Sequence, residues 1–178
     1  MSRARRLLLL RHAKAEPGEP EQDDHERRLA RRGRRDAERM GASMTARGLA
    51  PEQVLCSSAR RTRETLDRIL PHLPSGLALT VDRRLYLASP DEILARIAEV
   101  EDRVRSLLVV GHNPGIAALA ERLAGQGDSD ALARLRRKFP TGALAEIEVD
   151  SPRWRDLAPA GATLASFLTP RDCAGDDG

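Results

Sequence analysis

Residues 7–12 read Leu-Leu-Leu-Leu-Arg-His. Four apolar residues in a row are typical of a short strand that is buried on both faces of a sheet, and here an arginine and a histidine follow it directly. The same arrangement recurs where Val54–Cys56 precedes Ser57, and where Leu107–Val110 precedes Gly111-His112-Asn113. Three buried strands are therefore expected to end in polar side chains.

The rest of the chain alternates between strand and helix patterns. Strands are expected at residues 7–10, 54–56, 78–81, 107–110, 143–149 and 162–168. Helices are expected at 30–47, from Ser57-Ser58 to about 70, from 90 onward and at 114–124, with loops at 15–26 and 125–130. This order predicts an α/β fold, a three-layer sandwich with a mostly parallel central sheet and helices on both faces.

Three helix ends carry local signals. Gly48 follows the first helix, at a position where a left-handed residue often ends a helix. Ser57 or Ser58 can cap the second helix with its hydroxyl group. The run Ser89-Pro90-Asp91-Glu92 combines serine at the N-cap, proline at the first helical position and glutamate at the third, which together predict a helix start.

Length and composition indicate one soluble globular domain. The chain has 178 residues, of which 40% are hydrophobic, enough for a single core over residues 1–173. Only four residues are aromatic, so Leu, Val, Ile and Ala must form most of that core. The last residues, 174–178, are expected to be a disordered tail.

Cysteine usage and hydropathy bear on the compartment. Cys56 and Cys173 are too few and too far apart for a disulfide framework or a zinc site. The apolar run at 7–10 is shorter than the roughly 7 to 15 residues of an export signal, and no stretch approaches the roughly 20 apolar residues of a membrane span. We therefore expect a cytoplasmic protein that does not associate with a membrane.

The formal net charge is +3, and the excess of basic residues lies in the first 70 residues. Two explanations stay open: a solvated arginine-rich surface, or a basic face that attracts phosphate-bearing or acidic partners. Nucleic acid is not an expected partner, because the scattered aromatic residues offer no platform on which bases could stack.

The polar residues at the three strand ends suggest a chemistry. Ligands of open α/β sheets bind beyond the carboxyl ends of the strands, so two histidines and at least two arginines would converge there. Guanidinium groups bind phosphate and spread its charge, and a neutral imidazole can attack phosphorus to form a covalent phosphohistidine. This chemistry needs no cofactor, and no cluster of residues with the spacing of a metal site is present.

The sequence also resembles the histidine phosphatase superfamily, which has the phosphoglycerate mutase-like fold. The opening motif at 7–15 is similar to that of SixA-type phosphohistidine phosphatases, with Ala13 where many other members carry glycine. Further similar segments follow in the family's order at 26–29, 33–37, 57–65, 109–114 and 139–143. The resemblance covers about residues 7–170.

The resemblance implies roles for individual residues. His12 would be the nucleophile that becomes phosphorylated, and Arg11 and Arg61 would hold the phosphoryl oxygens. The family spacing selects Arg61 over Arg60 and Arg63, which would lie on the solvated helix surface. The remaining pocket residues would be His112, which completes the phosphate site, and the substrate-binding candidates Asn113 and Ser57. A turn role before Pro114 is an equal alternative for Asn113.

One departure from the family bears on the substrate. Many members carry an acidic proton donor, but the comparable stretch here, Asp82-Arg83-Arg84-Leu85-Tyr86, has arginine where that glutamate would fall. Asp82 is a candidate by proximity, and a surface charge is the alternative. A missing acid fits an easily departing leaving group, such as the imidazole of phosphohistidine.

The functional hypothesis is accordingly a metal-independent phosphatase acting on phosphohistidine in a signalling or phosphorelay protein. Two alternatives stay open. One is an ester phosphatase of the same superfamily, acting on a small molecule or a phosphoprotein; the other is a non-catalytic phosphate-binding module.

Overall fold

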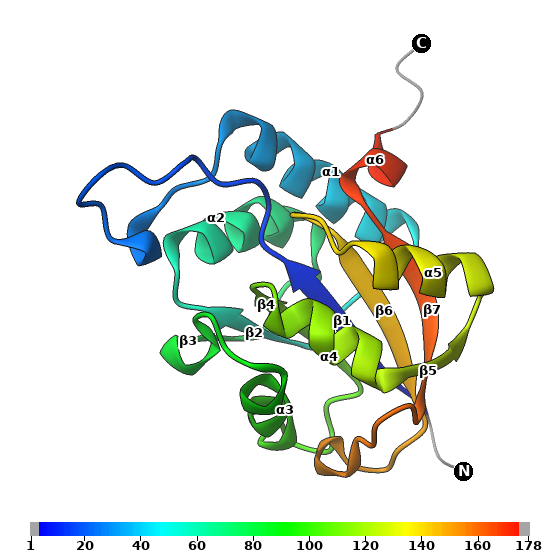
Figure 1. Ribbon diagram of the computed structural model, residues 1–178. Coiled ribbons are helices and arrows are strands. Elements are labelled where there is room, and N and C mark those ends of the chain that lie inside the picture. The colour runs from blue at the N-terminus through cyan, green and yellow to red at the C-terminus, as the bar shows by residue number, and fades with distance from the viewer. Residues whose placement is uncertain (1–3, 175–178) are drawn as a thin grey trace.

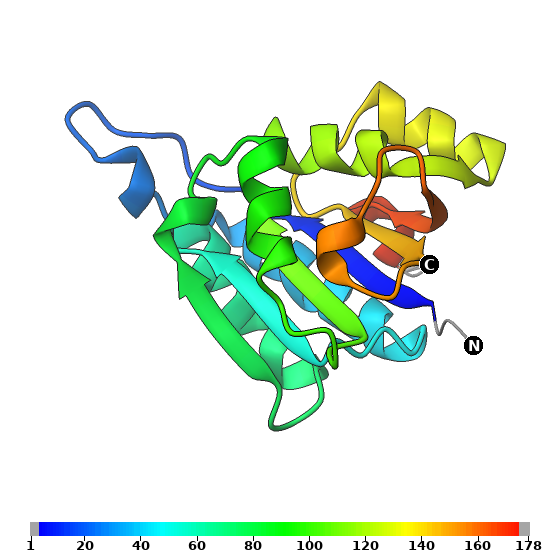
Figure 2. The same cartoon turned by 90° about the horizontal axis from the view of Figure 1, so that it is seen from below.

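One mixed sheet of seven strands organises the computed structural model, which describes residues 4–174 (Figures 1 and 2). The strands are β1 (Arg5–Arg11), β2 (Gln53–Ser57), β3 (Ala78–Asp82), β4 (Ser106–Gly111), β5 (Ala124–Gly127), β6 (Leu144–Val149) and β7 (Ala162–Leu168). The α-helices are α1 (Arg31–Ala46), α2 (Arg60–Ile69), α3 (Pro90–Ala98), α4 (Gly115–Leu123), α5 (Ser129–Arg137) and α6 (Pro170–Cys173). Short 3-10 helices are η1 (Asp24–Glu26), η2 (Leu70–His72), η3 (Arg83–Leu85) and η4 (Trp154–Asp156). Of the expected tail at 174–178, residues 175–178 lie outside the described part.

The sheet has the order β3-β2-β4-β1-β6-β7-β5. Strands β3, β2, β4 and β1 pair in parallel, and among the described residues only β6 runs against its neighbours. The expectation of a mostly parallel sheet with helices on both faces is therefore confirmed.

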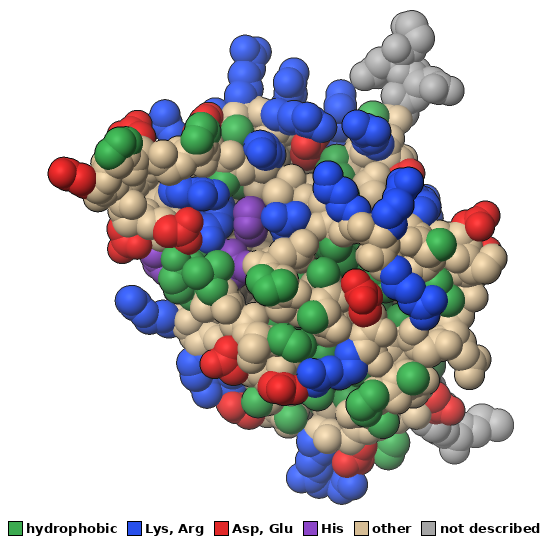
Figure 3. Space-filling model, viewed as in Figure 1, with side chains coloured by type: hydrophobic (Ala, Val, Ile, Leu, Met, Phe, Trp, Pro, Cys, Tyr) green, Lys and Arg blue, Asp and Glu red, His purple; other side chains and the backbone are tan. Residues whose placement is uncertain are grey.

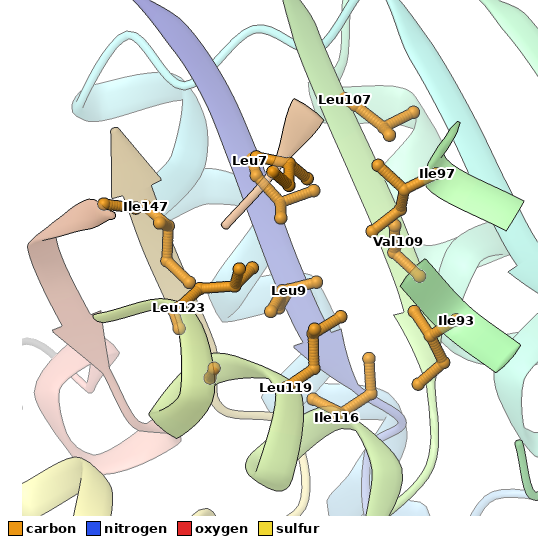
Figure 4. Close-up of a cluster of buried hydrophobic side chains, with 14 of the residues drawn as sticks. Leu7, Leu9, Ile93, Ile97, Leu107, Val109, Ile116, Leu119, Leu123 and Ile147 are labelled. Carbon is orange, nitrogen blue, oxygen red and sulfur yellow. The ribbon is translucent and has the colours of Figure 1, made fainter. Parts of the chain in front are cut away.

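The four leucines of β1 show how the layers form. Successive side chains of a strand point to opposite faces, so Leu7 and Leu9 join one core cluster and Leu8 and Leu10 another. The first cluster packs under α3 and α4, as Figure 4 shows for Ile93, Ile97, Ile116 and Leu119. The second is covered by α1 and α2, which supply Met40, Met44, Leu66 and Ile69.

Two expected helix ends are confirmed. Gly48 has a φ of 67°, the left-handed conformation that favours glycine after a helix. Ser89 accepts a hydrogen bond from the Glu92 amide, and the Glu92 carboxylate accepts one from the Ser89 amide, which completes the capping box of α3. No helix in residues 4–174 is both long and apolar enough to cross a membrane.

Two local expectations were wrong. Neither Ser57 nor Ser58 caps α2, whose N-cap is Ala59 without a side-chain hydrogen bond, because both hydroxyls are engaged by histidines, His112 and His25. The segment 125–130 is not a loop, since it contributes to β5 and opens α5. Glycines at an edge strand leave no side-chain alternation to recognise, although Asp128 carries a capping signal by accepting hydrogen bonds from two amides of α5.

Candidate active site

The functional side chains gather where β1, β4 and β2 end. These strands are neighbours, with Arg11 of β1 paired to Gly111 of β4 and Cys56 of β2 paired to Val110. The residues that follow them, His12 and His112, lie with their ring centroids 5.3 Å apart. They line a pocket of about 340 Å³, which opens on the face seen in Figure 3 beside basic side chains.

His12 is held as a neutral imidazole with a defined tautomer. Its Nδ1 lies 2.7 Å from the carbonyl oxygen of Ala13. A carbonyl can only accept, so Nδ1 carries the proton and the lone pair remains on Nε2. Burial lowers the pKa of His12 from 6.5 to about 4, and the positive charges of Arg61 and Arg11 also lower it. The imidazole is therefore neutral, and nucleophilic at Nε2, near pH 7.

Three arginines surround the pocket with unsatisfied donors. Arg61 donates to the backbone and side-chain oxygens of Asp24 at 2.6 and 3.0 Å, and Arg11 donates to the Phe139 carbonyl at 2.9 Å. Arg27, on the loop after η1, is the third arginine of the lining. Within residues 4–174, the Nε–H groups of all three are buried without a hydrogen-bond partner. The positive charges of three arginine side chains that line one pocket are what binds a phosphate-like oxyanion, which marks the pocket as a site for such a group.

His112 is positioned by Ser57. The Ser57 hydroxyl lies 2.7 Å from His112 Nε2, while His112 Nδ1 is buried without a partner among the described residues. Burial, then the neighbouring His12, lowers the pKa of His112 to about 3. Ser57 is fully buried and does not line the pocket. Its place in the structure is behind His112, in contrast to the direct substrate contact expected from the sequence.

The Phe139 carbonyl organises the opposite wall. It accepts hydrogen bonds from Arg11 and from Asn113 Nδ2, both at 2.9 Å. Asn113 lines the pocket, and its Oδ1 has no partner within residues 4–174. Asn113 therefore binds the same carbonyl as Arg11 at the pocket wall, and no hydrogen bond joins it to His112 within residues 4–174.

Comparison with known proteins agrees with this geometry. Residues 7–86 match the model of the histidine phosphatase superfamily, branch 1. The structure of a putative phosphohistidine phosphatase SixA from Nakamurella multipartitia is 35% identical, with a TM-score of 0.81, over 94% of this chain and 96% of that one. The chain belongs to the histidine phosphatase superfamily.

Two further similarities extend over most of this phosphatase. A putative phosphohistidine phosphatase SixA from Agrobacterium tumefaciens has a TM-score of 0.80 and 31% identity, over 95% of this chain and all of that one. An uncharacterised protein of Mycobacterium leprae is 40% identical over 168 residues, which cover 91% of this chain and the whole of the relative. The phosphatase is thus SixA-like across nearly its full length.

Sequence reasoning missed the carboxylate of the pocket. Asp24 of η1 lines it, pairs with Arg61, and accepts a hydrogen bond from the Tyr86 hydroxyl at 2.6 Å. The Tyr86 hydrogen bond, followed by Arg61 and Arg27, lowers the pKa of Asp24. Asp24 stands in an acid-rich loop, and the nearby match at 26–29 was the only signal that this loop returns to the site.

The expectation that Asp82 could be the acidic proton donor of the site was wrong. Its carboxylate pairs with Arg96 at 2.6 Å and with Arg84, away from the pocket residues. Asp82 also caps η3 by accepting the Arg84 amide, which is the reason an acid stands there. The pocket's only carboxylate within residues 4–174 is that of Asp24.

The three arginines at the start of α2 divide by burial. Arg61 has 3% of its surface exposed, whereas Arg60 and Arg63 are exposed and bond to Glu64 and to the Ser58 carbonyl. Adjacent helix residues point about 100° apart, so only one can enter the pocket.

No group of three or more His, Cys, Asp or Glu side chains that could hold a metal ion occurs in the described part of the chain.

Proposed function

We propose that this protein is a metal-independent phosphohistidine phosphatase that works through a phosphorylated His12. The proposal rests above all on one observation: a neutral imidazole with its lone pair on Nε2 lines the same pocket as three arginine side chains. The substrate class is supported by the two similar structures described as putative phosphohistidine phosphatases.

In the first step, His12 Nε2 attacks the phosphorus atom of the substrate. The new N–P bond forms as the bond to the substrate imidazole breaks, and that imidazole leaves with its electron pair and a proton. The positive charges of Arg11, Arg27 and Arg61 supply the stabilisation of the equatorial oxygens that phosphoryl transfer requires. When His112 Nε2 accepts a hydrogen bond from the Ser57 hydroxyl, the proton of the neutral ring is on Nδ1. His112 then offers a further N–H donor. Water then attacks phospho-His12 and releases inorganic phosphate.

Asp24 favours an imidazole over an alcohol as the leaving group. Because its pKa is lowered, it is ionised at neutral pH and cannot donate the proton that an alkoxide would need. An ionised carboxylate can, however, accept a hydrogen bond from the free N–H of a protonated phosphoimidazole. Such a contact would stabilise the form of phosphohistidine that departs most readily.

The test is phosphate release in the presence of a chelator from three substrates: a phosphohistidine peptide, a phosphoserine peptide and a sugar phosphate. We expect release from phosphohistidine, and rapid quenching in base should trap radiolabel on the wild-type chain but none on His12→Ala. Preference for an ester would move the assignment to an ester phosphatase. Binding of vanadate without turnover of any substrate would identify a phosphate-binding module, and full activity of His12→Ala would exclude the mechanism.

A further inference from the structure

A second, larger hollow adjoins the active-site pocket. It has a volume of about 560 Å³ and lies between the loop after β1, the start of α1, α5 and α6. We call it the basic groove, after its cationic lining residues Lys14, Arg32, Arg134, Arg137, Lys138 and Arg171. Figure 3 shows basic side chains gathered over α1, α5 and α6, on the face where the pocket opens.

The basic groove concentrates the positive charge of the molecule. Six cationic side chains and two carboxylates line it, a net charge of +4, against +3 for the whole chain. The remainder of the molecule is therefore slightly acidic. Only Lys14 and Arg32 of these cations belong to the basic first 70 residues, so the fold brings cations from both halves of the chain into one hollow. Such a concentration of charge favours a partner of opposite charge at this place.

Most of this charge is not neutralised by other side chains among residues 4–174. Arg134 pairs with Asp172, and Arg32 lies 3.6 Å from Asp36. The side chains of Lys14, Arg137, Lys138 and Arg171 make no hydrogen bond or ion pair within residues 4–174. Four like charges that converge without partners repel one another, and an acidic partner would relieve that repulsion.

The groove is continuous with the catalytic pocket. Lys14 and Thr141 line both hollows, and Lys14 stands two residues after His12. A phosphorylated residue seated on His12 would therefore place its flanking surface over the groove. We propose that the basic groove docks the acidic protein surface that surrounds the phosphorylated residue of the substrate, an inference that rests on the proposed function.

Nucleic acid fits the groove less well than an acidic protein. Binding of single strands relies on aromatic side chains on which bases stack. Of the four aromatic residues, Phe139, Trp154 and Phe167 are buried, and Tyr86 packs against His112 and His25. Phe167 lines the groove, but only 4% of its surface is exposed and the Arg134 guanidinium lies over its ring. The groove therefore offers charge with almost no exposed ring on which a base could stack, which suits aspartate and glutamate side chains.

The test compares two phosphohistidine peptides of equal length, one flanked by Asp and Glu and the other by Ser and Gln, with phosphoramidate as a small substrate. The variant Arg137→Glu/Lys138→Glu/Arg171→Glu reverses three groove charges without touching the pocket lining. The matched control Arg103→Glu/Arg153→Glu/Arg155→Glu makes the same charge change near the amino end of β4, at the N-cap of η4 and within η4, at the opposite end of the sheet from the pocket.

We expect wild type to favour the acidic peptide in kcat/KM by about tenfold or more at low salt, and the preference to shrink as salt rises. The groove variant should lose this preference, while the control variant keeps it and both turn over phosphoramidate within about twofold of wild type. Equal preference in the two variants, or none in wild type, would overturn the proposal. So would displacement of the acidic peptide by an oligonucleotide that binds more tightly and depends on the same three residues.

A binding measurement keeps this test independent of turnover. Fluorescence anisotropy of the labelled acidic peptide is recorded with His12→Ala, with and without the three groove substitutions. Binding that is lost on charge reversal supports the groove even if no substrate is hydrolysed, in which case the proposed function alone fails. Unchanged binding overturns the groove, whatever the enzyme hydrolyses.

Discussion

Gly33 is the position at which one added methyl group should damage both the fold and the active site. It is the third residue of α1, and a Cβ atom there would lie 2.0 Å from the Lys14 carbonyl oxygen and 2.9 Å from its carbonyl carbon and amide nitrogen. These are backbone atoms, so no side chain can rotate away. The same carbonyl accepts the Ala30 amide at 2.9 Å, which ties α1 to the segment after His12.

The effect of Gly33→Ala on stability can be worked from these contacts. Alanine normally stabilises a helix interior by about 1 kcal/mol over glycine. Here α1 and the Lys14 backbone must separate by at least about 1 Å, which costs about 1–3 kcal/mol through overpacking. Straining the hydrogen bond from the Ala30 amide to the Lys14 carbonyl costs about 1 kcal/mol more. The net expectation is a loss of about 2 kcal/mol, or a fall in Tm of about 4–8 °C for a chain of this size.

The effect on activity follows from the position of Lys14. It adjoins Ala13, whose carbonyl sets the tautomer of His12. A displacement of 1 Å in a catalytic group can lower the rate about 100-fold, so we expect kcat/KM for phosphohistidine to fall about 10- to 100-fold. The assays are thermal unfolding and steady-state phosphate release.

Gly48→Ala is the matched control at the other end of α1. No atom lies within 4 Å of its Cβ position, but its φ of 67° costs alanine about 1 kcal/mol. It should lower Tm slightly and leave kcat/KM unchanged. If Gly33→Ala melted at or above the wild-type temperature with kcat/KM within twofold of wild type, the argument from close backbone approach would be refuted.

Three further predictions concern the pocket. Ser57→Ala should lower kcat about tenfold with little change in Tm, because His112 loses its orienting hydroxyl; loss of folding instead would contradict the positioning role. Asp24→Asn should reduce the ratio of kcat/KM for phosphohistidine over phosphoserine about tenfold, and an unchanged ratio would remove Asp24 from leaving-group selection. The free energy of unfolding should fall by up to about 3 kcal/mol as the pH drops from about 6.5 to about 4. In that range the histidine at position 12 takes up a proton in the unfolded chain, whereas buried His12 in the folded chain stays neutral. Denaturant titrations at pH 7 and 4.5 measure this. His12→Asn should make the dependence shallower without removing it, because buried neutral His112, whose pKa is lowered to about 3, contributes in the same direction. An equal slope in both proteins would show that His12 is not buried neutral.

Much of the fold follows from local patterns. The runs of β1 and β4 could be recognised because a strand buried on both faces must be apolar at every position. The start of α3 could be recognised because its capping box satisfies the backbone groups of Ser89 and Glu92, which are only three positions apart. β5 and α5 could not be recognised in the sequence. A glycine-rich edge strand has no alternation of apolar and polar side chains, and α5 buries only Leu135 among its residues.

The candidate site divides in the same way. By itself, the sequence determined that His12 and His112 follow buried strands, since the order of residues along a chain decides what a strand runs into. Only the tertiary structure decided that Asp24 returns to the pocket, that Ser57 stands behind His112, and that Asp82 turns away. Asp24 and Ser57 are placed by contacts with Arg61 and His112, which lie 37 and 55 positions away in the sequence, and Asp82 turns toward Arg96 of α3. A local pattern does not record such contacts. The basic groove is of the same kind, because its charges come from three helices and a loop that meet only when the sheet has folded.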